Sequence, residues 1–169
     1  MCVLIYKPSG IKMPSKRILK ACFRANPHGA GFATPAGVHH SMNFIGIYRM
    51  LCTIPKEEPC ILHFRLATTG SVCLKNCHPF KKNGIFFAHN GVLNIPTTND
   101  MTDSETAFLS LYPYIEKFGL ESDELRYAVQ SIIGVSKFAI MQKERVKLFG
   151  SFTCIDGIYF SNIRWQHYM

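Results

Sequence analysis

A cysteine occupies the second position of the chain, directly after Met1. Aminopeptidases remove an initiator methionine that precedes a small residue, which would leave Cys2 with both a thiol and a free α-amine. The ordinary pKa of an α-amine is about 7.7–8.0 and that of a thiol about 8.5, so the amine can accept the thiol proton near neutral pH. One residue would then supply nucleophile and base, as an N-terminal threonine can. Cys2 is thus a candidate nucleophile for acyl transfer, and the alternative is an incidental cysteine.

An acyl-transfer site also needs hydrogen-bond donors where negative charge develops on the attacked carbonyl oxygen. Asn90 and Gly91 follow the apolar run 85–89 and could provide a side-chain amide and a backbone N–H. The same pair, followed by Val92 and Leu93, is typical of a tight hairpin turn. Read by itself, the dipeptide therefore leaves both an oxyanion site and an ordinary turn open.

Two charged residues could hold the head group of an amino-acid substrate. Arg65 lies in the otherwise apolar run 61–67, where a buried guanidinium needs a partner such as a carboxylate. Asp103 could pair with an ammonium group. The alternatives are an internal salt bridge for Arg65 and a helix N-cap for Asp103.

Hydrophobic patterning and turn residues predict the elements that would position these residues. We expect strands over residues 3–6, 31–34, 38–41, 60–67, 85–89, 137–142, 145–149 and 157–161. We expect helices up to about residue 25 with Ser15 as N-cap, up to 51 with Asn43 as N-cap, from 103 onward with a kink or split at Pro113, and over 122–133. Strands are grouped at both ends of the chain with helices between them. This grouping favours an α+β fold of layered, largely antiparallel sheets over alternating βαβ units.

The composition is that of one globular domain spanning residues 1–169, with 47% apolar and 18% charged residues. The N-terminus lacks the basic segment of a signal peptide, so we expect a cytoplasmic protein whose seven cysteines are thiols. No apolar run is long enough to cross a membrane. Cys73, Cys77 and His78 are the nearest approach to a metal-binding cluster. No second group of ligands accompanies them at the spacing of a zinc site, so no metal is expected.

The net charge of +8 is partly concentrated on one predicted helix, where Lys16, Lys20 and Arg24 recur at every fourth position. On a helix these side chains form one basic stripe. A solvated face is one interpretation. Contact with an anionic partner such as nucleic acid is the other, although no nucleic-acid-binding motif accompanies the stripe. His63 and His89, which flank the candidate residues, are interpreted as core histidines with satisfied hydrogen bonds.

Seven short stretches occur in the order found in one enzyme family and span nearly the whole chain. They are Met1-Cys2, Asn26-Pro27-His28-Gly29-Ala30-Gly31, His63-Phe64-Arg65-Leu66-Ala67-Thr68-Thr69-Gly70, Asn76-Cys77-His78-Pro79-Phe80, Phe87-Ala88-His89-Asn90-Gly91, Thr102-Asp103-Ser104-Glu105 and Tyr159-Phe160-Ser161-Asn162. With these stretches the chain resembles the glutaminase domain of class II glutamine amidotransferases, an N-terminal-nucleophile family that includes glucosamine-phosphate synthase and amidophosphoribosyltransferase. The resemblance implies a four-layer αββα sandwich of two mainly antiparallel sheets, the Ntn-hydrolase type.

The resemblance also implies roles for the candidate residues. Cys2 would be the nucleophile with its own α-amine as base, and Asn90 with the Gly91 N–H would form the oxyanion hole. The implied substrate-binding residues are Arg65 for the α-carboxylate of glutamine, Asp103 for its α-ammonium group, and Thr68 near the substrate. The chemistry so implied requires no cofactor.

Two positions depart from the family pattern, because Leu66 stands where many relatives have tryptophan and Thr69 where some have histidine. The substrate is therefore expected to be glutamine or a related γ-glutamyl amide. Seven residues follow Asn162 and the chain has no phosphate-binding loop, so we expect the glutaminase part alone. Three functions are open: a stand-alone amidohydrolase, an ammonia-supplying subunit of a separate synthase, or an inactive binding module that uses the basic helix as its contact surface.

Overall fold

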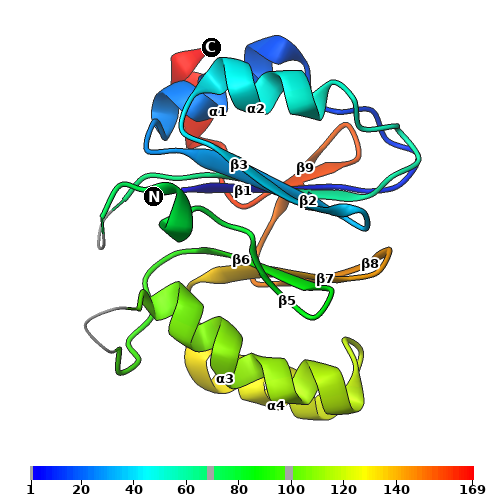
Figure 1. Ribbon diagram of the computed structural model, residues 1–169, viewed down its shortest axis with the longest axis vertical. Coiled ribbons are helices and arrows are strands. Elements are labelled where there is room, and N and C mark those ends of the chain that lie inside the picture. Colours follow the sequence, from blue (N-terminus) through cyan, green and yellow to red (C-terminus); the bar gives the residue numbers. More distant parts are fainter. Residues whose placement is uncertain (1, 68–70, 98–100) are drawn as a thin grey trace.

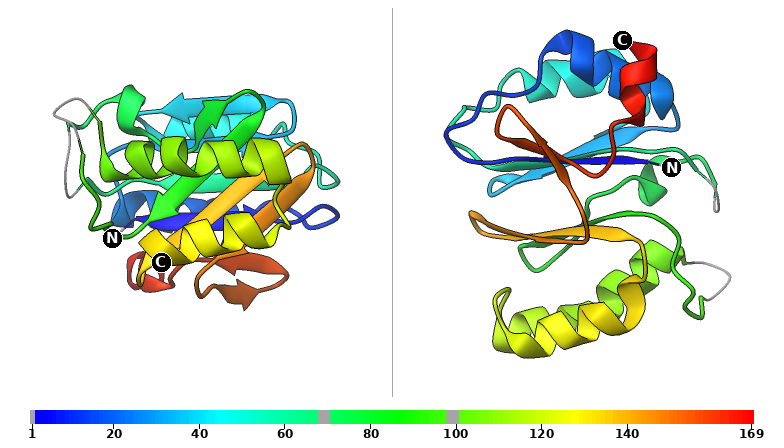
Figure 2. Two further views of the ribbon diagram at one scale, coloured as in Figure 1. Left: turned by 90° about the horizontal axis from the view of Figure 1, so that it is seen from below. Right: turned by 180° about the vertical axis from the view of Figure 1, so that it is seen from behind.

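The computed structural model describes residues 2–67, 71–97 and 101–169. Its elements form four layers in the order helices, sheet, sheet, helices, which Figure 1 shows from the side and Figure 2 from below and from behind. Both sheets are antiparallel, and each has one face covered by helices and the other face turned toward the second sheet. The predicted αββα sandwich is thereby confirmed.

The larger sheet has six strands in the order β3-β2-β4-β1-β10-β9. Its members are β1 (Val3–Lys7), β2 (Ala30–Thr34), β3 (Gly37–Ser41), β4 (Cys60–Phe64), β9 (Thr153–Ile155) and β10 (Ile158–Phe160). The predicted strand 60–67 is too long. Beyond Phe64 the chain leaves the ladder, and the Ala67 N–H donates to the His28 ring rather than to a neighbouring strand.

The smaller sheet has four strands in the order β5-β6-β7-β8. Its members are β5 (Phe80–Lys82), β6 (Ile85–Asn90), β7 (Lys137–Gln142) and β8 (Arg145–Phe149). The predictions for β7 and β8 are confirmed to the residue. The three-residue strands β5 and β9 were not predicted, because neither is long enough to display the alternation of apolar and polar residues that identifies a strand.

The α-helices lie outside the sheets on opposite sides of the molecule (Figure 1). They are α1 (Lys16–Ala25), α2 (Phe44–Leu51), α3 (Asp103–Phe118) and α4 (Asp123–Ile133), with short 3-10 helices η1 (Leu74–Asn76) and η2 (Arg164–Tyr168). None of the helices in the described part of the chain combines the length and apolar character required to cross a membrane.

Two predicted N-caps are confirmed and a third expectation is corrected. Ser15 and Asn43 accept hydrogen bonds from backbone N–H groups in the first turns of α1 and α2. For α3 the capping side chain is Thr102, so Asp103 is the first helical residue and not the cap. Pro113 lies inside α3, which continues through it as a single 16-residue helix, so the predicted split does not occur.

The tight turn of the smaller sheet lies at a different Asn-Gly pair from the one the sequence suggested. Asn83 and Gly84 join β5 to β6 with φ angles of 45° and 74°, as a two-residue hairpin turn requires. Asn90 and Gly91 end β6 without forming a hairpin, because Asn90 pairs with Lys137 of β7, which is far away in sequence. The residues that follow Gly91 are therefore free to take part in a loop at the edge of the sheet.

Three apolar cores fill the spaces between the four layers. The core between the sheets is made of Leu4, Ala33, Ile61, Phe86, Ala88, Ala139 and Met141. Along β1 the side chains alternate, with Leu4 in this core and Val3 and Ile5 in the core beneath α1 and α2. Cys2 precedes Leu4 by two positions, so this alternation directs its thiol toward the space between the two sheets.

A buried lysine ties the end of β1 to the loop before β4. Lys7 has 1% of its surface exposed, and its Nζ donates to the backbone carbonyls of Pro55, Lys56 and Glu58 at 3.2, 2.7 and 2.5 Å. Three acceptors compensate for the removal of the ammonium group from water. This role could not be predicted from the sequence, since a lysine at the end of a strand is ordinarily solvated.

Replacing Lys7 by methionine is expected to lower the free energy of unfolding by about 2–3 kcal/mol, because three backbone carbonyl groups lose a charged donor. Urea denaturation followed by circular dichroism measures the change. Lys12→Met is the matched control, since Lys12 is exposed and nearby in sequence. Equal stability of the two variants would show that the buried ammonium contributes nothing.

Candidate active site

The ends of several strands meet around Cys2 at one edge of the two sheets. Cys2 precedes β1, which pairs with β4 on one side and with β10 on the other. The register places Phe64, the last residue of β4, beside the start of β1 and brings the segment after Phe160 to the opposite side. In the second sheet, β6 ends at Asn90, whose side chain donates a hydrogen bond to Ser161. Sheet pairing therefore gathers four segments that are far apart in sequence.

Cys2 is held on both sides by neighbouring segments. Its Sγ accepts a hydrogen bond from the Leu66 N–H at 3.3 Å and lies 3.5 Å from the Leu66 carbonyl oxygen. Its backbone carbonyl accepts a hydrogen bond from Asn162 Nδ2 at 2.8 Å. The thiol of this residue thus has a defined position although it lies almost at the end of the chain.

The surroundings of the thiol oppose its ionisation. Burial raises the pKa of Cys2, while the hydrogen bond from Leu66, the positive N-terminus and the Arg65 cation offset part of this rise. The thiol is therefore protonated near neutral pH, and a nucleophilic role requires a nearby base to accept its proton.

Arg65 lies just beyond β4, with 5% of its surface exposed. Its backbone N–H donates to the Gly29 carbonyl at 2.8 Å, and its Nη1 donates to the Ser71 carbonyl at 2.9 Å. These contacts fix the direction of the guanidinium, which lines the same cleft as Cys2. A carboxylate in this cleft could accept further hydrogen bonds from the guanidinium.

Asn90 and Gly91 lie where β6 leaves the second sheet. Asn90 is 3% exposed, and its Nδ2 donates to Ser161 Oγ at 2.8 Å. Gly91 lines the cleft with a φ angle of 147°, and a Cβ atom there would lie 2.1 Å from Ser136 Oγ. Only glycine permits this close approach to Ser136, which leaves the backbone of Gly91 open to the cleft.

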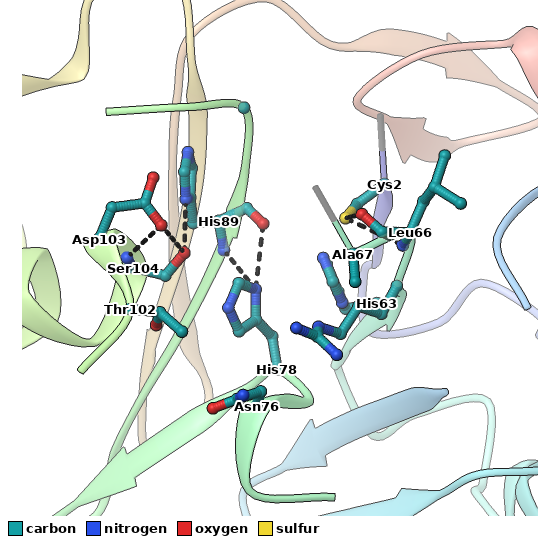
Figure 3. A pocket seen from close by; sticks show the side chains of 12 residues that line it. Cys2, His63, Leu66, Ala67, Asn76, His78, His89, Thr102, Asp103 and Ser104 are labelled. Carbon is teal, nitrogen blue, oxygen red and sulfur yellow. Dashed lines mark hydrogen bonds between the residues drawn. The ribbon is translucent and has the colours of Figure 1, made fainter. Parts of the chain in front are cut away.

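Asp103 faces Cys2 from the opposite wall, as Figure 3 shows. Its Oδ2 accepts the Leu93 N–H at 2.9 Å, and its Oδ1 accepts the Ser104 N–H at 2.8 Å. Ser104 Oγ also lies 2.8 Å from His89 Nδ1. The carboxylate is therefore rigidly oriented, and it retains lone pairs that could accept a hydrogen bond from an ammonium group.

Three buried histidines cross the floor of the cleft between these walls (Figure 3). The ring centroids of His63 and His78 are 4.4 Å apart, and those of His78 and His89 are 6.3 Å apart. Neither ring nitrogen of His63 has a hydrogen-bond partner within the described part of the chain, and the same holds for His89 Nε2. His63 is buried, as expected for a core histidine, but the hydrogen bonds predicted for it are absent among the described residues.

All three imidazoles are neutral near pH 7. Burial lowers the pKa of His63 to about 3, with His89 and Arg65 acting in the same direction. Burial also lowers the pKa of His89 to about 4, although Asp103 opposes the shift, and it lowers the pKa of His78 well below its usual value. Such weakly basic imidazoles are poor acceptors for a thiol proton.

Acid is expected to destabilise the fold through these histidines. Their folded pKa values lie below the unfolded value of 6.5, so unfolding takes up protons and stability falls as the pH drops below 6.5. Between pH 6.5 and 5, each histidine that stays neutral in the folded state should cost about 2 kcal/mol. Urea denaturation at pH 7.5 and 5 measures this loss.

Two histidine variants separate this effect from general acid sensitivity. His63→Leu should reduce the difference in stability between the two pH values, whereas His167→Ala, at an exposed position, should leave it unchanged. Equal stability of the unsubstituted chain at pH 7.5 and 5 would contradict the buried, neutral state of the three rings.

The cleft brings together four of the six residues predicted for the site, namely Cys2, Arg65, Gly91 and Asp103. Asn90 is buried beside it, and Thr68 lies outside the described residues. The cleft is partly open to solvent and has a volume of about 40 Å³, which is room for a few water molecules. A larger ligand would therefore extend into the open mouth of the cleft.

Several residues with a defined place in the site were given no role in it from the sequence. They are Leu66 and Asn162, which bind Cys2, Ser161, which binds Asn90, Ser71, which binds Arg65, and His78 and Ser104 in the cleft. Ser161 ends the last predicted strand and Asn162 follows it, and both lie in one of the seven stretches that resemble the enzyme family. The contacts themselves span up to 160 positions in sequence.

Comparisons with known proteins agree with this arrangement. A family model described as glutamine amidotransferases class-II matches residues 47–134. A search of curated proteins finds no significant match. Among solved structures, the chain is similar to a glutamine phosphoribosylpyrophosphate amidotransferase from B. subtilis complexed with ADP and GMP, with 18% identity and a TM-score of 0.63. It is also similar to an allosteric regulatory enzyme of purine biosynthesis, with 17% identity and a TM-score of 0.64. Each match covers 95% of this chain and 41% of the other.

Proposed function

The chain belongs to the class-II glutamine amidotransferases, and we propose that it hydrolyses the side-chain amide of glutamine, or of a related γ-glutamyl amide, through a thioester on Cys2. The observation that carries this proposal is the lining of one cleft by a thiol, a guanidinium, a carboxylate and a glycine backbone. These are the groups needed to attack an amide and to hold an amino-acid head group.

The free α-amine of Cys2, present once Met1 is removed, is the proposed base. Two features support it over a histidine. The pKa values of His63 and His89 are lowered to about 3 and 4, and the hydrogen bonds of Cys2 Sγ within the described residues go to Leu66 alone. An amine with an ordinary pKa of about 7.7–8.0 is far better matched to a thiol near neutral pH.

The proposed reaction has two stages. The amine takes the thiol proton, and the sulfur attacks the carboxamide carbon to form a C–S bond and an oxyanion, which the Gly91 N–H and Asn90 stabilise. The ammonium formed on Cys2 then protonates the leaving nitrogen, so the C–N bond breaks and ammonia departs from a γ-glutamyl thioester. Water adds to the thioester with the amine again as base, and glutamate and the thiol are released. Each step uses protein groups and water.

Binding of the amino-acid head group is assigned to the charged walls of the cleft. The guanidinium of Arg65 binds the α-carboxylate, and the carboxylate of Asp103 accepts a hydrogen bond from the α-ammonium group. Thr68 follows Arg65 by three positions and is proposed to lie near the substrate. Leu66 and Thr69 differ from the residues that many members of the family have at these positions. The proposal therefore does not specify which substituent, if any, the γ-amide nitrogen of the substrate carries.

Ammonia release from glutamine tests this function. Protein whose intact mass demonstrates loss of Met1 is incubated with L-glutamine, and glutamate and ammonia are measured. We expect equal amounts of the two products, with D-glutamine and L-asparagine turned over much more slowly because they cannot place amide and head group together. Absence of turnover with L-glutamine and with γ-glutamyl amides would refute the proposal.

Ammonia supply to a separate synthase is the second candidate function. It is favoured by apolar residues exposed beside the cleft, since Val72, Val92 and Val135 are 52%, 66% and 95% exposed. Val72 follows Ser71, the partner of Arg65, and the Val92 carbonyl accepts the hydroxyl of Ser136, the neighbour of Val135. A partner covering this rim would shield released ammonia from solvent. Affinity purification should then recover a synthase that accelerates glutamine turnover, and recovery of none would favour the stand-alone hydrolase.

A further inference from the structure

The side chain of Asn90 makes one hydrogen bond and leaves one polar atom unmatched. Its Nδ2 donates to Ser161 Oγ at 2.8 Å, and the residue is 3% exposed. Its Oδ1 is buried and has no hydrogen-bond partner within the described residues. A buried carbonyl oxygen without a donor is unfavourable, so this orientation of the carboxamide is not the best one available to it.

The hydroxyl group of Ser161 has the opposite problem, because it accepts hydrogen bonds but has no acceptor for its own proton among the residues that the structure describes. Its Oγ accepts the Leu4 N–H at 2.9 Å as well as the Asn90 amide, so both lone pairs of the hydroxyl are used. Its other contact with Leu4 runs through the backbone, where the Ser161 N–H donates to the Leu4 carbonyl at 2.8 Å. Across the described part of the chain, the hydroxyl proton of Ser161 is given no acceptor.

Turning the Asn90 carboxamide by half a rotation about its Cβ–Cγ bond resolves both problems without changing the shape of the side chain. Ser161 Oγ then donates its proton to Oδ1 while it still accepts the Leu4 N–H. In this orientation the Leu4 N–H donates to the serine hydroxyl, and the serine hydroxyl donates to the amide oxygen of Asn90. Each donor in this series of hydrogen bonds then has an acceptor. Nδ2 moves to the buried position that Oδ1 now occupies.

We propose that Ser161 is a positioning residue that holds Asn90 in this turned orientation during the reaction, so that Nδ2 donates to the developing oxyanion. The inference rests on the proposed hydrolysis of a glutamine amide. In the orientation that the structure shows, the buried amide oxygen of Asn90 has no donor and the hydroxyl proton of Ser161 has no acceptor among the described residues. An oxyanion accepts a hydrogen bond only from the turned orientation, so its formation selects that state.

The same segment also aligns the nucleophile. Leu4 lies in β1, two positions after Cys2, and Asn162, which follows Ser161, donates to the Cys2 carbonyl at 2.8 Å. The end of β10 is therefore in hydrogen-bond contact with the strand that carries the thiol and with the side chain that would stabilise the oxyanion. A change at Ser161 should act on the oxyanion donor without removing the thiol.

Steady-state kinetics of Ser161→Ala and Ser161→Thr test the proposal. Ser161→Ala is expected to lower kcat for glutamine about tenfold and to leave KM nearly unchanged, because one oxyanion donor is impaired and not removed; complete loss typically costs about 10²–10³. Ser161→Thr keeps the hydroxyl and is expected to recover most of the rate. Thermal unfolding of each variant reports any loss of stability from the Leu4 N–H contact.

A double-mutant cycle separates positioning from a merely structural effect. Asn90→Ala should lower kcat by about 10²–10³, and adding Ser161→Ala to it should cause no further loss if Ser161 acts through Asn90. Alkylation of Cys2 by iodoacetamide, followed on the N-terminal peptide by mass spectrometry, is the second readout. That displacement forms no oxyanion, so its rate should be the same in Ser161→Ala and in the unsubstituted protein.

Three outcomes would overturn the positioning role: unchanged kcat in Ser161→Ala, multiplicative losses in the double variant, or slowed alkylation of Cys2 in Ser161→Ala. Each of these leaves the proposed function intact, provided that the unsubstituted protein releases ammonia from glutamine. If the unsubstituted protein turns over neither glutamine nor a γ-glutamyl amide, the proposed function fails first and the role of Ser161 falls with it.

Discussion

Replacing Cys2 by alanine is expected to lower the rate of ammonia release from glutamine by at least about 10⁴-fold, since removal of a catalytic nucleophile reduces kcat to the level that binding and the oxyanion donors alone support. The α-amine survives in the variant, but without sulfur no thioester forms. Ammonia release measured with and without the substitution, on protein freed of Met1, gives the ratio directly.

The fold of this variant should be unaffected. Cys2 lies before β1 and is partly exposed, so alanine removes one sulfur atom at the edge of the sheet and opens no cavity in the cores. Cys52→Ala is the matched control, because Cys52 is an exposed thiol that follows α2 and does not line the cleft. Retention of substantial turnover by Cys2→Ala, or an equal loss in Cys52→Ala, would rule out Cys2 as the nucleophile.

Replacing Arg65 by methionine is expected to lower kcat/KM for glutamine by about 10–150-fold, the factor that corresponds to loss of charged hydrogen bonds worth 1.5–3 kcal/mol. Most of the effect should appear in KM. The α-carboxylate is remote from the amide that reacts, so its binding is similar in the ground state and in the transition state. Arg65→Lys should recover part of the loss, because lysine restores the charge without the two-pronged geometry.

A substrate without the α-carboxylate distinguishes a role of Arg65 in substrate binding from a role in maintaining the structure. With γ-aminobutyramide, Arg65→Met should match the unsubstituted protein, because the guanidinium then has no anion to bind. The contact of Arg65 with the Ser71 carbonyl means that the substitution also affects the loop after β4, so thermal unfolding is measured in parallel. Equal losses of kcat/KM with glutamine and with the truncated amide would assign Arg65 a structural role alone.

The two outer helix layers differ in how they relate to this chemistry. Helix α3 begins at Asp103 and supplies one wall of the cleft, while α1 and α2 cover the opposite sheet. The basic stripe of α1, formed by Lys16, Lys20 and Arg24, is exposed. The described structure pairs none of these side chains with a carboxylate.

Local patterns in the sequence determined most of the secondary structure. Ser15 and Asn43 stop the chain before α1 and α2 because their side chains bond to backbone groups three residues away, an interaction that any short segment can reveal. The alternating strands β7 and β8 were likewise predicted to the residue. The strands β5 and β9 and the true hairpin turn at Asn83 were missed, since they depend on a partner strand more than on their own sequence.

The sequence by itself therefore determined the family, the α+β layers and the set of residues proposed to carry the chemistry. Tertiary structure alone decided the hydrogen-bond partners and the protonation of those residues. Asn90 and Ser161 are 71 positions apart, and Cys2 and Asn162 are 160 apart. Burial of Lys7 and of the histidine rings depends on all the layers that cover them. The physical reason is that hydrogen bonding and desolvation act between atoms that are close in space, and only the pairing of distant strands determines which atoms those are.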